Sequence, residues 1–426
     1  MKNLFKFSDF LINRKNRYKP REAEKLILKR IDKIDFKGNI FLSDKKSNTE
    51  MILVKSGDLV ISGINVEKGA VAVYTDKDDV LATIHYSSFQ YNPKIIDIDY
   101  LKLLLKSPQF KKLINSLTNN GIKKEIKPKH LLSLEILLPS IDEQKTTLLK
   151  VNEILEQNVL LENIQLSQIK DISTLRQSIL QDAIQGKLVP QDPNDEPAEK
   201  LLEKIKDEKE KLIKDGKIKK EKPTSPISPK EIPFELPNGW MWSRFKEIAH
   251  IASNLVSPNK YLDYNHIAPN NIEKFTGKLL PYQTVDDDKV TSINHLFNSG
   301  QILYSKIRPN LSKVVIIDFD GLCSADMYPI DSYIYPRYLY IYMLSTTFLS
   351  IAIKKDTRVA MPKINQEELN KITVPIPPLN EQKRIVEKVE SLMKICDEQE
   401  KNLTEAKDSI NKLNQAILSE VFRGEL

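Results

Sequence analysis

The chain has 426 residues, more than one compact core usually holds, so we expect two or three domains. It is 40% apolar and 29% charged, and no stretch approaches the roughly 20 consecutive apolar residues of a membrane span. The first ten residues contain no apolar run resembling a signal sequence. Cys323 and Cys396 stand far apart, which argues against a disulfide framework or a cysteine-based zinc site and favours a cytoplasmic protein.

Positive charge is concentrated in the first third of the chain. Residues 1–140 contain 26 Lys and Arg against 16 Asp and Glu, a balance of +10, whereas residues 236–376 contain 15 against 13, or +2. A basic domain suggests an anionic partner, and nucleic acid is the usual one in the cytoplasm. A lysine-rich, solvated surface would explain the charge equally well.

Residues 1–138 predict a mixed α/β domain. Met51–Val54 and Asp58–Ser62 are short β-rich runs separated by a Ser-Gly turn, and Tyr100–Leu117 has the apolar spacing of a helix. Residues 139–188 then predict one long helix, with Asp142 and Glu143 near its positive end and Gly186 at its stop. A helix of about 44 residues is about 65 Å long and needs a partner along its length.

Residues 189–235 predict a connector. A Glu/Lys run over 198–214 is expected to form a solvated, exposed helix, and the Pro/Ser-rich stretch 222–230 cannot build a packed core. A second globular domain follows over residues 236–376. Its segment Asn298–Ser305 repeats the pattern of Lys55–Ser62 (305 − 62 = 243).

The helix start also occurs twice. Leu137-Leu-Pro-Ser-Ile-Asp-Glu-Gln-Lys145 corresponds to Pro375-Ile-Pro-Pro-Leu-Asn-Glu-Gln-Lys383, and the ends of the two helices keep the same offset (377 − 139 = 426 − 188 = 238). Residues 377–426 therefore form a second long helix, and the chain is predicted to be a domain–helix–domain–helix duplication.

The two long helices are expected to pack on each other as a coiled coil. On the second helix, a 4-3 spacing selects Leu392, Cys396, Gln399, Leu403, Ala406, Ile410, Leu413 and Ile417 as the seam. The matching positions on the first helix are Ile154, Asn158, Leu161, Gln165, Gln168, Ile172, Leu175 and Ile179. Because the middle of the first helix is polar, we expect the two different helices to pack on each other, and not each helix on a second copy of itself.

The sequence contains no motif that would supply catalysis. A Walker-type phosphate loop, a dinucleotide-binding glycine motif and the Asn-Pro-Pro-Tyr tetrapeptide of amino-methyltransferases are all missing. The five histidines do not have metal-ligand spacing. We therefore expect neither catalytic residues nor metal ligands in this chain.

Three motifs together resemble the specificity (S) subunit of type I restriction–modification systems. They are Pro377-Pro-Leu-Asn-Glu-Gln-Lys383, the helix end Phe422-Arg-Gly-Glu-Leu426, and the domain opening Leu236-Pro-Asn-Gly-Trp240. The resemblance implies an α+β fold in which residues 1–138 and 236–376 are target recognition domains. It also implies that the helices form an antiparallel spacer in a pseudo-twofold repeat. The first domain departs from the pattern, because it begins Phe7-Ser-Asp-Phe-Leu11 and lacks the Leu-Pro-x-Gly-Trp opening.

The same resemblance implies the partners. They are double-stranded DNA, two modification subunits that carry S-adenosylmethionine and methylate adenine, and restriction subunits that use ATP and Mg²⁺, with no cofactor in this chain. Each recognition domain would bind one half of a bipartite, asymmetric DNA site, and the spacer would set the gap. Two alternatives are a self-contained DNA modification or nuclease enzyme and a DNA-binding coiled-coil scaffold without sequence specificity.

Loops are the expected places for DNA contacts, because Lys and Arg bind phosphates while Arg, Asn, Gln and Lys bind base edges. After the Ser-Gly strand of each domain, the candidates are Asn65, Lys68, Lys306, Arg308 and Asn310. Before each spacer helix, they are Asn120, Lys123, Lys124, Arg358 and Lys363. Ordinary solvation of polar loops is the competing explanation.

Overall fold

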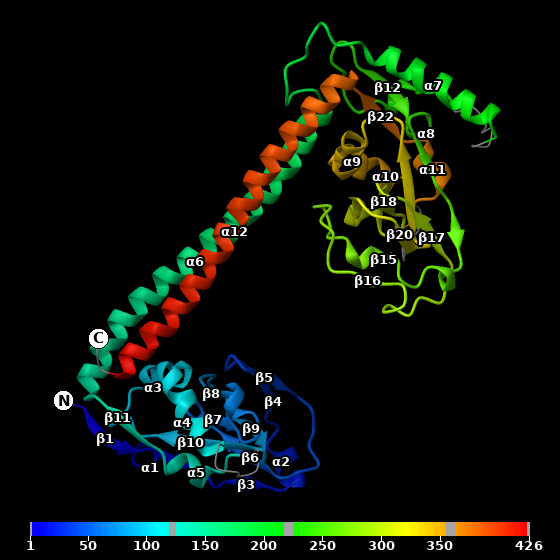
Figure 1. The fold of residues 1–426 in the computed structure, drawn as a ribbon. Helices are drawn as coiled ribbons and strands as arrows, with labels where there is room; N and C mark the ends of the chain where they lie inside the picture. Colours follow the sequence, from blue (N-terminus) through cyan, green and yellow to red (C-terminus); the bar gives the residue numbers. More distant parts are fainter. Residues whose placement is uncertain (1, 119–124, 217–224, 355–362, 424–426) are drawn as a thin grey trace. The chain divides into compact units, whose positions relative to one another are not determined.

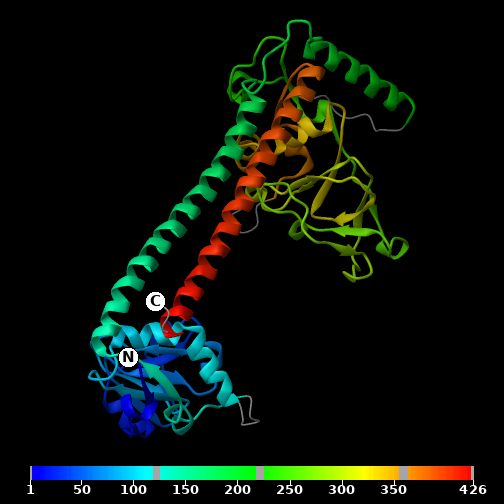
Figure 2. The same cartoon turned by 60° about the vertical axis from the view of Figure 1, so that its left-hand side comes forward.

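The computed structural model describes residues 2–118, 125–216, 225–354 and 363–423 (Figures 1 and 2). It divides into two compact units, Met1–Ser167 with Leu403–Leu426, and Gln168–Asn402. Each unit contains one globular domain and a part of both long helices, α6 (Ile141–Ile184) and α12 (Leu379–Arg423). The predicted boundaries between domains and helices therefore run through compact units, because each domain shares its core with the helix segments beside it.

The first domain is closed by its first and last strands. β1 (Asn3–Lys6) pairs antiparallel with β11 (Glu135–Leu138), so the chain leaves the domain where it entered and continues directly into α6. The other strands are β2 (Leu11–Asn13), β3 (Arg17–Tyr18), β4 (Arg30–Ile34), β5 (Ile40–Ser43), β6 (Met51–Val54), β7 (Leu59–Ser62), β8 (Val71–Val73), β9 (Val80–Thr83) and β10 (Tyr86–Tyr91). The helices are α1 (Phe7–Phe10), α2 (Pro20–Lys25), η1 (Val66–Lys68), α3 (Ile98–Lys106), α4 (Pro108–Thr118) and α5 (Pro128–Leu132).

The helical stretch predicted over Tyr100–Leu117 is two helices instead of one. α3 ends at Lys106, Ser107 has an extended backbone, and α4 begins at Pro108. The Ser107 hydroxyl accepts a hydrogen bond from the Phe110 N–H at 3.1 Å and so satisfies a donor at the start of α4. Proline fits the first turn of a helix but not its interior, which explains the break.

The second domain is closed in the same way, by β12 (Met241–Arg244) and β22 (Thr373–Ile376). Its other strands are β13 (Ala249–Ile251), β14 (Leu255–Val256), β15 (Asn265–Ile267), β16 (Gln283–Thr284), β17 (Asn294–Phe297), β18 (Ile302–Ser305), β19 (Val314–Ile316), β20 (Gly321–Ser324) and β21 (Met327–Ser332). Its helices are α8 (Phe245–Ile248), η3 (Pro258–Lys260), η4 (Pro269–Asn271), η5 (Pro309–Leu311), α9 (Pro336–Leu344), α10 (Thr346–Lys354) and α11 (Gln366–Asn370).

The two domains have the same sheet topology. A four-stranded sheet runs β2-β10-β7-β8 in the first domain and β13-β21-β18-β19 in the second. A five-stranded sheet runs β3-β6-β9-β4-β5 in the first and β14-β17-β20-β15-β16 in the second. Each five-stranded sheet has a parallel pair at the equivalent place, β4 with β9 and β15 with β20. The predicted α+β duplication is confirmed.

The long helices are antiparallel. In the first unit, the Asn158 amide N–H donates to Asn414 Oδ1 at 2.6 Å, and in the second unit Arg176 contacts Asp397 at 2.7 Å. From the first contact to the second, the residue number therefore rises on α6 (158 to 176) and falls on α12 (414 to 397). In both views the two helices run alongside each other (Figures 1 and 2). The predicted antiparallel coiled coil is present.

The predicted seam is wrong at several positions. Leu161 and Leu175 are 48% and 52% exposed, and Gln168, Gln399 and Leu413 are also exposed. Their places are taken by less exposed neighbours one residue further on: Glu162, Ile169 and Arg176 on α6, and Glu400 and Asn414 on α12. Reading the seam from apolar residues fails here because polar side chains of the two helices satisfy one another inside it.

The connector is more ordered than expected. α7 (Ala198–Lys214) packs its apolar side, with Ala198 and Ile205 buried, against the core of the second unit. The Lys209 ammonium lies 5.0 Å from the Tyr333 ring centre and donates to the Lys246 carbonyl at 2.6 Å. The prediction of a solvated helix thus holds for only one of its faces. A short turn, η2 (Pro229–Glu231), precedes the second domain.

Both cysteines are buried thiols. Within the described ranges, no helix is long and apolar enough to cross a lipid bilayer.

Candidate nucleic-acid interface

The predicted loop of the first domain, residues 63–69 (the first loop), is fixed by backbone hydrogen bonds at its base. The Ser62 N–H donates to the Ala70 carbonyl at 3.0 Å, which brings the two ends of the loop together. The Gly63 N–H donates to the His85 carbonyl at 3.0 Å, and the Gly63 carbonyl accepts from the Ile126 N–H at 2.8 Å. The loop thus projects from a rigid base made by three segments of the domain.

The predicted loop of the second domain, residues 306–312 (the second loop), has the same three bonds. The Ser305 N–H donates to the Lys313 carbonyl at 3.0 Å, and the Lys306 N–H to the Asp326 carbonyl at 3.0 Å. The Ile364 N–H donates to the Lys306 carbonyl at 2.9 Å. The two loops, paired from sequence alone, therefore occupy equivalent places in the two domains.

The first loop exposes Ile64, half-exposes Asn65, and turns through η1. The exposed Lys68 ammonium lies 5.9 Å from the Phe36 ring centre. Gly69 closes the loop with φ +100°, and a Cβ there would approach the Phe36 carbonyl oxygen to 2.5 Å. Only glycine fits this position, so the shape of the loop depends on it.

The second loop has a strained backbone. Arg308 and Ser312 both have left-handed conformations, with φ of +49° and +45°. Such conformations cost non-glycine residues on the order of 1–3 kcal/mol each and cluster at functional sites. Between them Pro309 is buried, whereas Arg308 and Asn310 are exposed. The left-handed backbone at Arg308 and Ser312 therefore shapes a short, anchored turn that leaves the side chains of Arg308 and Asn310 exposed.

Lys306 and Lys363 are engaged within the second domain. The Lys306 ammonium donates to the Ala325 carbonyl at 2.6 Å and lies 5.3 Å from the Tyr328 ring centre. Lys363 pairs with Asp326 at 3.2 Å, and its backbone bridges to Ile307 of the second loop. The structure thus brings the two predicted stretches of this domain together. It leaves Arg308 and Asn310 as the outward-facing candidates.

Lys313, which follows the second loop, is held close to the domain. Its ammonium donates to the Pro269 carbonyl at 2.5 Å. Burial, followed by repulsion from Arg308, lowers the pKa of Lys313.

Four of the predicted residues, Asn120, Lys123, Lys124 and Arg358, lie outside the described residues. Ile126 and Lys363, which come shortly after them in the chain, contact the first and second loop respectively. Basic residues that the prediction missed also surround the first loop. Arg14, Lys15, Arg17 and Lys127 line a hollow beside Gly63. The run Arg14-Lys15-Asn16-Arg17 was the available signal for this hollow.

The repeated helix start attaches each domain to its helix through one glutamine. In the first unit, Gln144 is fully buried, accepts from the Asp97 N–H at 2.9 Å, and donates to the Pro139 and Ile95 carbonyls at 2.9 Å. In the second unit, Gln382 is fully buried, accepts from the Tyr335 N–H at 3.0 Å, and donates to the Pro377 carbonyl at 2.9 Å. Glutamine, backbone donor and proline acceptor all keep the offset (382 − 144 = 335 − 97 = 377 − 139 = 238).

The glutamate of the repeat has a different role in each copy. Glu381 is 1% exposed and accepts from the Trp240 indole N–H at 3.0 Å and from the Gln191 amide at 3.5 Å. Burial raises the pKa of Glu381. Glu143 is exposed and caps its helix, and the hydrogen bond from the Ser140 backbone contributes most to lowering its pKa to about 2. The first domain contains no tryptophan equivalent to Trp240, which accounts for the different role of Glu143.

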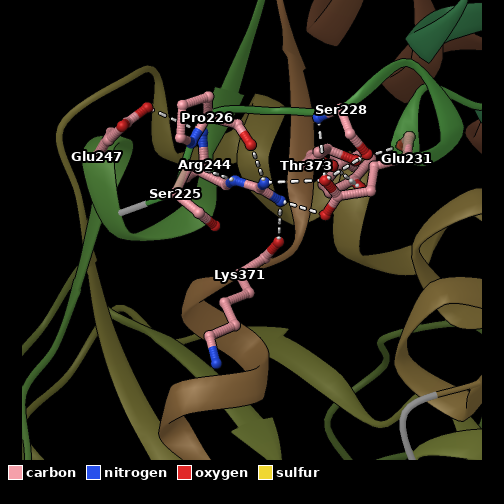
Figure 3. Close-up of polar contacts among 9 residues, drawn as sticks. Ser225, Pro226, Ser228, Glu231, Arg244, Glu247, Lys371 and Thr373 are labelled. Carbon is pink, nitrogen blue, oxygen red and sulfur yellow. Dashed lines mark hydrogen bonds and ion pairs between the residues drawn. The ribbon is translucent and has the colours of Figure 1, made fainter. Parts of the chain in front are cut away.

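Arg244 fixes the end of the connector to the second domain (Figure 3). Its side chain is almost fully buried, and it pairs with both oxygens of Glu231 at 2.7 and 3.0 Å. Its remaining N–H groups donate to the carbonyls of Lys371 at 2.7 Å, Pro226 at 3.0 Å and Ser225 at 3.3 Å. The hydrogen bonds from Arg244 contribute most to lowering the pKa of Glu231 to about 2.

Comparison with known proteins gives the family. Residues 237–406 match the type I restriction modification DNA specificity domain. The chain is 39% identical over 345 residues to the type I restriction enzyme EcoDI specificity subunit of Escherichia coli, covering 80% of this chain and 72% of that protein. It is 34% identical over 258 residues to the EcoAI specificity subunit of the same organism, covering 58% of this chain and 44% of that protein.

Solved structures show the same fold. A structure describing complex assembly and conformational transition of the type I R-M system matches with a TM-score of 0.68 and 15% identity, covering 100% of this chain and 98% of that chain. The crystal structure of the HsdS subunit from Thermoanaerobacter tengcongensis matches with a TM-score of 0.54 and 16% identity, covering 100% and 97%. The chain belongs to the family of type I restriction enzyme specificity subunits. Its relatives are specificity subunits, which are non-catalytic, so the expectation of a non-catalytic DNA-specificity chain is confirmed.

Proposed function

We propose that this specificity subunit binds a bipartite, asymmetric site in double-stranded DNA, one half with each recognition domain. One observation carries the proposal. The first and second loops are held by the same three backbone hydrogen bonds but present different side chains, Asn65 and Lys68 against Arg308 and Asn310. A shared scaffold with unlike side chains is what recognition of two unlike half-sites requires.

The gap between the half-sites is proposed to be set by the two long helices. A fixed gap requires that each domain does not rotate or slide on its helix. Gln144 and Gln382 supply this attachment, because each lies in α6 or α12 and its buried side chain bonds to a backbone N–H of the domain and to the proline carbonyl just before the helix. The two bonds that both copies share, from the domain N–H and to the proline carbonyl, favour a common role for the two glutamines.

The helices are also the proposed docking surface for two modification subunits. On the face of α6 turned away from its seam, Leu149 and Leu160 are 74% and 60% exposed, and Ile164 lies on the same face at helical spacing. The positions of α12 equivalent to Leu149 and Leu160 are Glu387 and Glu398 (149 + 238, 160 + 238), so the two docking surfaces differ in chemistry. S-adenosylmethionine would bind the modification subunits, and ATP and Mg²⁺ the restriction subunits.

Methylome sequencing tests this function. A host that expresses the chain with its modification subunit should methylate one motif made of two different specified halves and a constant gap. Deleting the gene for this chain should abolish that methylation. A scaffold without sequence specificity would give no motif, and a continuous or palindromic motif would contradict the assignment of one half-site to each domain. Arg308→Ala should relax one half of the motif and Asn65→Ala the other.

A further inference from the structure

The first unit has a large basic hollow on one side of the first loop. This lysine hollow has a volume of about 730 Å³ and lies between the β4–β5 turn, residues 66–69, the α3–α4 corner and the end of α12. Five lysines line it: Lys37, Lys68, Lys102, Lys106 and Lys111. Among the described residues that line it, Glu67 is the one carboxylate. Such a surface attracts a polyanion.

A second basic hollow lies on the other side of the same loop. This arginine–lysine hollow has a volume of about 540 Å³, and Gly63 is part of its wall. Four basic residues line it, Arg14, Lys15, Arg17 and Lys127, and among the described residues that line it Glu125 is the one carboxylate. Arg14 bonds to the buried Asp58 and is fixed by it, whereas the side chains of Lys15 and Lys127 are exposed.

Sheet order places the two hollows at opposite edges of one sheet. Strands β2 and β10 contribute Asn13, Tyr86 and Ser87 to the arginine–lysine hollow, and β8 contributes residues 71–73 to the lysine hollow. The order β2-β10-β7-β8 puts three inter-strand steps between these edges. At about 4.8 Å a step, that is roughly 14 Å. The first loop, which follows β7, lies between the hollows.

We infer that the first loop enters the major groove of DNA and that the two hollows receive the two phosphate backbones bordering that groove. The major groove is about 12 Å wide, which agrees with the separation of the hollows. Lysine and arginine bind phosphates without regard to sequence, whereas Ile64 and Asn65 on the loop offer an apolar contact and an amide suited to base edges. This inference rests on the proposed DNA-recognition function and adds the orientation and phosphate contacts of the first domain.

The second domain shows that the lysines are not required by the fold. Tyr340, Leu344 and Leu349 stand at the positions of Lys102, Lys106 and Lys111 (offset 238). The Tyr340 hydroxyl donates to the Gly277 carbonyl at 3.4 Å and fills the equivalent space. The same helix corner can therefore pack without lysines, which favours a binding role for the lysines of the first domain.

The salt dependence of DNA binding tests the inference. The full chain in complex with its modification subunits would be titrated with the cognate duplex found by methylome sequencing and with a scrambled duplex, at several salt concentrations. Each lost phosphate contact reduces the slope of log K against log salt by about 0.9. We expect Lys106→Ala/Lys111→Ala and Lys15→Ala/Lys127→Ala each to reduce the slope by up to about 2 and to weaken both duplexes by the same factor.

Matched controls lie beside two of the substituted lysines. Lys112→Ala changes the next residue of α4, and Lys129→Ala changes a lysine of α5, but neither residue lines a hollow. Both should keep the wild-type slope. Asn65→Ala should change the preference among bases at an unchanged slope. Unchanged slopes in both double variants would overturn the inference, and a change in only one would refute the two-backbone arrangement. A wild-type complex that does not prefer the cognate duplex would contradict the proposed function instead.

Discussion

The Trp240 indole N–H donates to the Glu381 carboxylate at 3.0 Å, joining the opening motif of the second domain to the start of α12. This bond links two motifs that the sequence presents separately, Leu-Pro-Asn-Gly-Trp and Pro-Leu-Asn-Glu-Gln-Lys. It gives the tryptophan a polar function in addition to its packing against Tyr338. The second unit contains both tryptophans of the chain, Trp240 and Trp242, so fluorescence reports the unfolding of this unit.

The buried Glu381 should make the stability of the second unit depend on pH. Burial raises the folded-state pKa of Glu381 above its unfolded value of about 4.3. The folded state then binds more protons, so the free energy of unfolding should fall as pH rises from the unfolded pKa through the folded one. Trp240→Phe removes a bond that opposes the rise in pKa, so it should extend this loss to higher pH. It should also cost about 1.5–3 kcal/mol where the carboxylate is charged.

Urea unfolding followed by tryptophan fluorescence between pH 4 and 8 measures this dependence. Glu381→Gln is the control, because it removes the titrating group and should flatten the profile. An identical pH profile in wild type and Glu381→Gln would show that Glu381 does not titrate in this range.

The glutamines at the two helix starts should determine the gap length of the DNA site. Gln382→Leu keeps the side-chain volume but leaves the partly buried Tyr335 N–H without its acceptor, at a cost of about 1–3 kcal/mol. The loosened domain should accept sites whose gap is one base pair longer or shorter. Gln144→Leu should have the same effect through Asp97. Methylome sequencing reads the gap directly, with the exposed Lys383→Ala as the control. A single unchanged gap in both glutamine variants would refute this role.

The duplication and the order of elements could be predicted because they leave a constant offset in the sequence. The positions of the two loops followed from the same offset, and the structure gives both loops the same anchoring bonds. Gln144 and Gln382 were visible in the repeat, but a polar residue near a helix start gives no indication that it is buried. The lysine hollow was beyond sequence reasoning, because Lys37, Lys68 and Lys106 come from three distant segments.

The seam could not be read correctly because apolar spacing is a rule about single residues, whereas polar seam residues depend on their partners. Leu175 looks like a better seam residue than Arg176. Arg176 nevertheless lies in the seam, because Asp397 and Glu400 on α12 pair with it at 2.7 and 3.1 Å. Such pairs are recognised only when the two helices are aligned.

Arg244 and Glu231 should make the second unit sensitive to acid. The hydrogen bonds that lower the folded pKa of Glu231 to about 2 stabilise the folded state above the unfolded pKa of about 4.3. That contribution should be lost as pH falls from about 4.3 towards 2. Arg244→Leu also leaves three backbone carbonyls without their donor and should destabilise the unit by about 1–3 kcal/mol.

Tryptophan fluorescence during acid titration follows this change. The wild type should lose stability below pH 4.3, and Glu231→Gln should lose much less over the same range while remaining less stable at pH 7. Lys230→Ala is the matched control, because Lys230 immediately precedes Glu231 in the chain and is exposed. Equal acid sensitivity in wild type and Glu231→Gln would place the acid-labile group elsewhere.

The partly buried Asn158–Asn414 pair should fix the register of the helices in the first unit. Asn158→Leu leaves Asn414 without its partner in a partly buried seam and should cost about 1–3 kcal/mol. The double Leu variant should recover that loss, since two apolar residues pack without unmet hydrogen bonds. Its register would then be less strictly defined. Denaturation of the single and double variants gives the coupling energy, and additive losses would show that the asparagines do not interact.

Two substitutions of Arg308 can separate the effect of backbone strain from the effect of DNA contact. Arg308→Ala keeps the left-handed backbone at φ +49° and removes the guanidinium, so binding of the cognate duplex should weaken by about 1–3 kcal/mol. Arg308→Gly removes the same guanidinium and relieves the strain, so its second unit should be about 1 kcal/mol more stable than that of the alanine variant. Both variants should therefore lose equal affinity but differ in unfolding midpoint. Wild-type affinity in both would exclude Arg308 from the interface, and equal midpoints would mean that its backbone is not strained.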